Sequence, residues 1–131
     1  MFTSPSWSIH RPLIQPLSLQ LTHLGLSILW NVAGVILLSQ GLPALGPTTS
    51  LASVPLMLVV AVALLVGARQ LPVLYVTASG LAGLVAAFTI FGGLTKDPAL
   101  WPAEGWRYGG ILINAVGVTG ALWGIKRLLF I

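Results

Sequence analysis

Charged side chains are scarce in this sequence of 131 residues. Only 6% of the residues are charged and 56% are hydrophobic, whereas about 25% of an ordinary soluble domain is charged. Such a chain has too few polar residues to coat a soluble fold, so we expect the lipid bilayer to be its solvent. The sequence therefore predicts one compact integral membrane domain.

Cysteine is absent, and only two carboxylates are present, Asp97 and Glu104. The first absence excludes disulfides, thiolate metal sites and a thiol nucleophile. Neither carboxylate falls inside a long apolar run. Because intramembrane carboxylates are typical of proton relays and cation sites, their absence argues against an antiporter that depends on one.

Motifs for catalysis are also missing. The sequence has two histidines and scattered serines, with no GxSxG, HExxH or phosphate-binding loop. A hydrolase needs a nucleophile positioned beside a base, and the glycines near the carboxyl end do not follow a strand as a dinucleotide-binding motif would. We therefore expect a protein that is not an enzyme.

Long apolar runs dominate what is present. A membrane-spanning helix needs about 20 mostly apolar residues, and four segments qualify: about 17–40, 51–68, 72–94 and 108–130. Short links rich in proline and glycine make neighbouring helices antiparallel. The sequence predicts an all-α bundle of four transmembrane helices with both termini on the same side. Residues 1–16 are predicted to form an irregular N-terminal arm, with Phe2 and Trp7 at the membrane interface.

Basic residues indicate the orientation. They stand singly between apolar runs, which fits membrane orientation rather than nucleic-acid binding. The side of the predicted termini holds Arg11, Arg69, Lys126 and Arg127; the other side holds Lys96 and Arg107. The excess predicts cytoplasmic termini, in a bacterial inner membrane or a thylakoid.

Small and polar residues mark the faces that pack together, because leucine gains nothing by leaving lipid. They recur at helical spacing in three of the predicted spans. The first span has His23, Ser27, Asn31, Gly34 and Leu38, the third has Ser79, Gly80, Gly83 and Ala87, and the fourth has Gly110, Asn114, Gly117, Ala121 and Gly124. We expect these three spans to make the tightest contacts and the second to be the most lipid-exposed.

The first and fourth spans share the pattern NxxGV, at Asn31–Val35 and Asn114–Val118. Since these spans cross in opposite directions, an inverted repeat is one interpretation. The other is that each asparagine makes an interhelical hydrogen bond, the two bonding to each other if their depths match.

His23 is the candidate cofactor ligand. It could bind haem iron or the magnesium of a chlorophyll, or it could hydrogen-bond a neighbouring helix. His10 is separated from it by Pro12 and Pro16 and does not have the spacing of a second ligand on one helix. No cofactor is required by the sequence.

The segment before the fourth span is unusually polar. Asp97 followed by Pro98 predicts an N-cap and a short interfacial turn, and Glu104 is spaced to pair with Arg107. The aromatic side chains suit the headgroup level and are Trp101, Trp106 and Tyr108. With Glu104 and Arg107 they form either an aromatic belt or a docking site for a partner protein.

Three functions remain open. The leading hypothesis is a non-catalytic accessory, structural or assembly subunit of a larger membrane complex, respiratory or photosynthetic, whose partners are lipid, other membrane subunits or further copies of itself. The second is a module that binds a pigment, a haem or a quinone near His23, Asn31 and Asn114. The third is an oligomeric channel for a small neutral solute, lined by the same asparagines with Ser27 and Thr119.

Overall fold

The computed structural model describes Ile9 and residues 11–130. These residues form four long helices and no strand: α1 (Ile14–Ser39), α2 (Ser53–Arg69), α3 (Pro72–Thr95) and α4 (Glu104–Leu129). Two short 3-10 helices, η1 (Arg11–Leu13) and η2 (Pro98–Leu100), precede α1 and α4. The prediction of an all-helical chain is confirmed for this part of the sequence.

The expectation of an irregular arm over residues 1–16 is wrong for residues 11–16, which are helical. The chain is helical from Arg11, and Pro16 lies in the first turn of α1. A proline is tolerated there because the first four backbone N–H groups of a helix have no partner within it. The expectations for Phe2, Trp7 and His10 lie outside the described residues.

Among the residues that the structure describes, three helical segments are long and apolar enough to cross a membrane: Arg11–Ser39, α3 and α4. The helix α2 is apolar but has 17 residues. At about 1.5 Å per residue it extends roughly 25 Å, slightly less than the bilayer core of about 30 Å. A fourth crossing stays a prediction.

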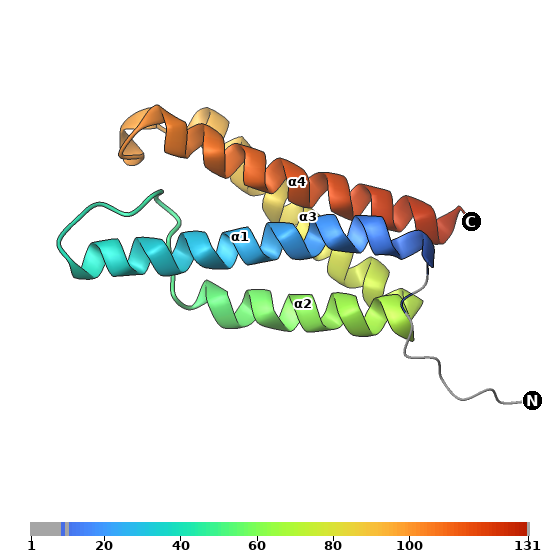
Figure 1. Cartoon of the computed structure of the whole chain (residues 1–131). Helices are drawn as coiled ribbons and strands as arrows, with labels where there is room; N and C mark the ends of the chain where they lie inside the picture. Colours follow the sequence, from blue (N-terminus) through green and yellow to red (C-terminus); the bar gives the residue numbers. More distant parts are fainter. Residues whose placement is uncertain (1–8, 10, 131) are drawn as a thin grey trace, which may run out of the picture.

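The four helices form a ring in which each packs against two others (Figure 1). The helix α4 packs along both α1 and α3, as expected, whereas α1 and α3 face each other diagonally. The start of α1 and the end of α4 lie at one end of the bundle, which we call the terminal end. Residues 40–52 and 96–103 lie at the opposite end, the loop end.

The helices α2 and α3 touch at the terminal end and diverge toward the loop end (Figure 1). At Gly67 the two backbones come so close that an added Cβ would lie 2.5 Å from the backbone nitrogen of Tyr75. The link between them is only Gln70 and Leu71. This close contact acts as the apex of a wedge-shaped gap between the two helices.

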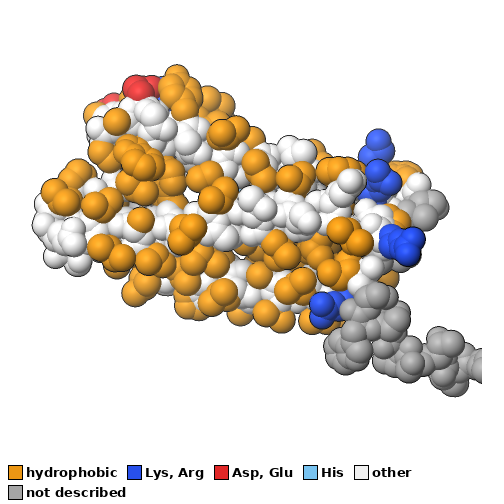
Figure 2. Space-filling view, viewed as in Figure 1, with side chains coloured by type: hydrophobic (Ala, Val, Ile, Leu, Met, Phe, Trp, Pro, Cys, Tyr) orange, Lys and Arg blue, Asp and Glu red, His pale blue; other side chains and the backbone are white. Residues whose placement is uncertain are grey.

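Large side chains fill the terminal end, where Leu13, Leu64 and Tyr75 are fully buried. Elsewhere, many large hydrophobic side chains face outward (Figure 2). In a bilayer this exposure carries no penalty, because lipid tails are as apolar as the side chains they cover. The helix α2 buries only Leu64, Gly67 and Ala68, fewer residues than any other long helix.

Candidate functional site

A cavity of about 800 Å³ occupies the wedge between α2 and α3. The helices α1 and α4 form its floor, and residues 46–48 and Trp101 border its loop end. The floor carries His23, Ser27 and Asn31 from α1 and Gly110, Ile111 and Asn114 from α4. Ligand sites typically have volumes of about 300–1,000 Å³, so the cavity is large enough for a molecule of cofactor or lipid size.

The cavity opens sideways, between α2 and α3. Three residues of its rim are largely exposed although they line it: Leu56 of α2 is 65% exposed, and Val85 and Phe88 of α3 are 66% and 73% exposed. These side chains lie on the outer apolar surface of the bundle. The opening therefore leads from the apolar surface of the bundle to the polar floor of the cavity.

A buried polar stripe on α1 faces the bundle interior. Gln20, His23, Ser27 and Asn31 are each less than a tenth exposed. They follow one another at spacings of three and four, which places them on one face of the helix. The stripe runs from the packed terminal end to the cavity floor.

His23 hydrogen-bonds Asn114 of α4, with 3.2 Å between Nε2 and Oδ1. The Nδ2 group of Asn114 donates to the carbonyl of Gly110 at 2.8 Å, so the oxygen that faces His23 can only accept. Nε2 therefore donates this bond, and in the neutral ring Nδ1 carries the lone pair. This arrangement links α1 to α4 beside the cavity.

The other side of the His23 ring lies against Gly117. A Cβ added to Gly117 would lie 2.6 Å from Nδ1 of His23. Axial ligation of a haem or chlorophyll through Nε2 would thus break the bond to Asn114, and ligation through Nδ1 would require the ring to move away from Gly117. No group of three or more His, Cys, Asp or Glu that could hold a metal ion occurs among residues 9 and 11–130.

The two NxxG patterns make the same local arrangement. Asn31 donates from Nδ2 to the carbonyl of Ser27 at 2.8 Å, and its Oδ1 accepts from the backbone N–H of Ser50 at 2.8 Å. An added Cβ at Gly34 would lie 2.6 Å from Thr49. Asn31 thus accepts from Ser50, whose neighbour Thr49 packs on Gly34. In the same way Asn114 accepts from His23, whose ring packs on Gly117.

Asn114 thus makes the predicted interhelical hydrogen bond, to His23. Asn31 instead binds the loop before α2. The alternative in which the two asparagines bond to each other is wrong, because each oxygen has another donor.

Aromatic rings close the loop end of the cavity. Trp30 lies against Gly110, whose added Cβ would be 3.5 Å from the ring, and meets Trp106 edge-on with 5.9 Å between the ring centroids. An added Cβ at Gly46 would lie 3.0 Å from Nε1 of Trp101. The loop before α2 and the link before α4 therefore contact each other above the cavity.

The polar segment before α4 behaves largely as its sequence predicts. The side chain of Asp97 accepts from the N–H of Ala99 at 3.0 Å and caps η2. Arg107 forms the predicted ion pair with Glu104 at 2.8 Å and also donates to the carbonyl of Gly93 at 3.0 Å. Trp106 and Tyr108 are exposed and Trp101 is half-buried.

Some residues assigned to inward faces are exposed instead. Leu38, Ala87 and Thr119 lie on the outer surface, because each falls one residue or one turn away from the side on which its helix meets its neighbours. Thr119 donates to the carbonyl of Ala115 in its own helix and does not line the cavity. Gly83 and Gly124 do meet other helices: an added Cβ at Gly83 would lie 2.9 Å from Ala121, and one at Gly124 would clash with the Tyr75 hydroxyl.

A buried polar cluster at the terminal end was missed by sequence reasoning. The Tyr75 hydroxyl donates to Oε1 of Gln20 at 2.6 Å, and Nε2 of Gln20 donates to the Ser79 hydroxyl at 2.8 Å. The sequence held one indication of this cluster, because Gln20 lies three residues before His23 on the same face of the helix. Tyr75 carried no such signal because an aromatic residue at the start of a span is also typical of the interface.

The arrangement can bind and orient a molecule, and it offers no nucleophile activated by a base within the described residues. No protein family matches this sequence, and no curated protein or solved structure matches it. The cavity, its lateral opening and its polar floor are therefore the basis for assigning a function.

Proposed function

We propose that this chain is a non-catalytic integral membrane protein that binds a lipid-soluble molecule in the cavity between α2 and α3. The observation that carries the proposal is the lateral opening of the 800 Å³ cavity onto the apolar surface. The proposal includes four crossings, with both termini on the cytoplasmic side of a bacterial or thylakoid membrane. The 17 residues of α2 are at the lower limit of about 17 for a crossing.

The walls and the floor select for an elongated molecule with one polar end. The side walls of the cavity are mostly apolar, with Met57 and Val60 from α2 and Ala82 and Phe88 from α3. The floor offers hydrogen-bond donors, among them the Ser27 hydroxyl. Nε of Arg107, which also lines the cavity, is buried and has no hydrogen-bond partner among the described residues. A head group with carbonyl oxygens, as in a quinone, matches these donors.

Metal-containing ligands fit less well. In the described arrangement both ring nitrogens of His23 face α4, through Asn114 and Gly117. A quinone-type head needs only donors on the floor and leaves this contact intact. We therefore choose the quinone class over haem or chlorophyll.

The two other hypotheses have weaker support. The cavity lining extends no further toward the terminal end than Val60 on α2, and the fully buried Leu64 and Tyr75 fill the interior beyond it. Within residues 9 and 11–130, the cavity of a single chain does not continue to the terminal end, which gives the channel hypothesis less support. The role of an accessory subunit stays a prediction, because its outer apolar faces suit lipid and protein partners equally.

Binding can be measured through the protein's own fluorescence, because Trp30 and Trp101 line the cavity. We expect a short-chain quinone to quench tryptophan emission of the detergent-solubilised protein in a saturable manner. Ala82→Phe fills the cavity from α3 and should weaken binding at least about tenfold, since even one misplaced methylene costs about 1–3 kcal/mol in a fitted pocket.

Leu84→Phe is the matched control, because Leu84 lies on the outer face of the same helix. It should leave the dissociation constant unchanged. Unsaturable quenching, or equal quenching in both variants, would mean that the quinone only partitions into the micelle, and the proposed function would be wrong.

A further inference from the structure

The terminal end carries basic side chains and no Asp or Glu among the residues that the structure describes. Four basic residues gather there (Figure 2): Arg11, Arg69, Lys126 and Arg127. The only Asp and Glu of the sequence, at positions 97 and 104, lie at the loop end, and Glu104 pairs with Arg107. Lys126, Arg127, Arg69 and Arg11 are all exposed, so a negatively charged molecule can approach them from solution or from the lipid headgroup layer.

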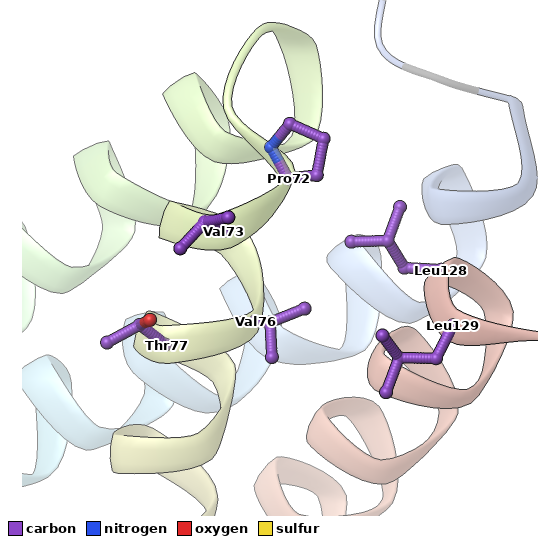
Figure 3. Close-up of a pocket in the computed structure, with 6 residues that line it drawn as sticks. All are labelled: Pro72, Val73, Val76, Thr77, Leu128 and Leu129. Carbon is purple, nitrogen blue, oxygen red and sulfur yellow. The ribbon is translucent and has the colours of Figure 1, made fainter.

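An apolar groove of about 420 Å³ begins at the same end, between the start of α3 and the end of α4 (Figure 3). Its walls are Pro72, Val73, Val76 and Thr77 from α3 and Leu128 and Leu129 from α4. Thr77 supplies the only side-chain hydroxyl. The groove lies on the outside of the bundle and is separate from the cavity between α2 and α3, with which it shares no lining residue.

The groove and the basic residues are adjacent along the chain. Lys126 and Arg127 directly precede Leu128, and Arg69 lies three residues before Pro72. The guanidinium of Arg127 also lies over the ring of Trp123, with 5.8 Å between its Cζ and the ring centroid. This contact holds a charged group on the surface of α4 one turn from the groove.

We propose that this groove and its basic residues bind an anionic phospholipid, with an acyl chain along the groove and the phosphate near Lys126, Arg127 and Arg69. Charge complementarity selects this occupant. A zwitterionic lipid has no net charge to pair with four basic side chains that have no Asp or Glu beside them, and a second copy of this chain would bring four more. An anionic lipid supplies both the apolar chain and the negative head group that the surface lacks.

Native mass spectrometry of the full chain in an uncharged detergent can count bound lipids. Phosphatidylglycerol and phosphatidylcholine with identical acyl chains are titrated separately. We expect phosphatidylglycerol to bind more tightly, and the double variant Lys126→Gln with Arg127→Gln to lose most of that preference, at about fivefold per basic residue. Lys96→Gln, at the loop end, is the matched control and should keep the preference.

The groove is tested separately by Val76→Trp, which fills it and leaves every charge in place. This variant should weaken binding of phosphatidylglycerol, and inorganic phosphate alone should not displace the lipid at equal concentration. Equal binding of the two lipids by the wild type, or an equal loss in Lys96→Gln and the double variant, would overturn the proposal. Displacement by inorganic phosphate, with no effect of Val76→Trp, would show an anion site and likewise overturn it.

Phosphatidylglycerol binding at the groove is expected to be independent of the cavity between α2 and α3. Ala82→Phe should not alter phosphatidylglycerol binding, because Ala82 does not line the groove. Failure of the lipid proposal would therefore leave the proposed quinone site untouched, and the reverse also holds.

Discussion

At the scale of single residues, glycines decide how closely the helices approach. Gly124 of α4 faces the hydroxyl of Tyr75, Gly117 faces His23, and Gly67 faces the backbone of Tyr75. The first two of these close approaches bring polar groups of different helices within hydrogen-bonding distance. Tyr75 can reach Gln20, and His23 can reach Asn114, because the glycine behind each ring leaves room for it.

Gly124→Ala should therefore destabilise the bundle. The new methyl group would occupy the position of the Tyr75 hydroxyl, so either the bond to Gln20 breaks or α4 moves outward. We expect a loss of about 1–3 kcal/mol, the usual cost of overpacking, measured as a shift in the unfolding midpoint in mixed micelles of sodium dodecyl sulfate.

The control is Gly25→Ala on α1, where an added Cβ meets nothing within 4 Å. This change should be neutral or stabilising by up to about 1 kcal/mol, since alanine favours a helix over glycine. Equal midpoints for the two variants would contradict the proposed role of Gly124.

At the scale of elements, the loop between α1 and α2 sets the width of the wedge. Its Ser50 N–H is held by Asn31, and Thr49 packs on Gly34. The helix α2 begins only three residues later, at Ser53. Holding the loop against α1 therefore fixes where α2 starts and how far it lies from α3 at the loop end.

Asn31→Ala should loosen this loop without unfolding the helices. Without its acceptor, the Ser50 amide should exchange its hydrogen about fivefold faster, as expected for a hydrogen bond worth about 1 kcal/mol. Hydrogen exchange followed by mass spectrometry of residues 41–52 measures the effect.

Ser39→Ala is suited as the control, because the Ser39 hydroxyl bonds only the carbonyl of Ile36 in its own helix. Its exchange pattern over residues 41–52 should match the wild type. Unchanged exchange at Ser50 in Asn31→Ala would mean that Thr49 and Gly34 alone hold the loop.

At the scale of the whole molecule, the number of membrane crossings depends on α2. In the described part of the chain, three helical segments satisfy the length and hydropathy of a crossing, and α2 is apolar but short. In Figure 1, α2 runs alongside α1 from the terminal end but begins short of the point where α1 ends. A bilayer that accommodates the other three would then also contain α2, with slight local thinning at its ends.

Single cysteines can test this topology directly, because the natural sequence has none. We expect Gln70→Cys to react with an impermeant thiol reagent from the cytoplasmic side, and Gln40→Cys and Ala99→Cys from the opposite side. All three residues are exposed. Labelling of positions 40 and 70 from the same side would show that α2 does not cross.

The sequence by itself determined the class of the protein and most of its local structure. Helix boundaries fall within a few residues of their predicted positions, because hydropathy, proline and glycine act over single turns. The N-cap at Asp97 and the pair of Glu104 with Arg107 were predicted for the same reason, since their partners lie within three residues.

Only the tertiary structure decided the partners of the buried polar groups and the location of the cavity. Asn31 and Asn114 lie in identical local patterns, yet one binds a loop and the other a histidine on a neighbouring helix. Gln20 accepts a hydrogen bond from Tyr75, which lies 55 residues later in the sequence. Such pairs depend on how each helix is rotated and tilted, and the wedge itself comes from the close contact at Gly67, which no local pattern specifies.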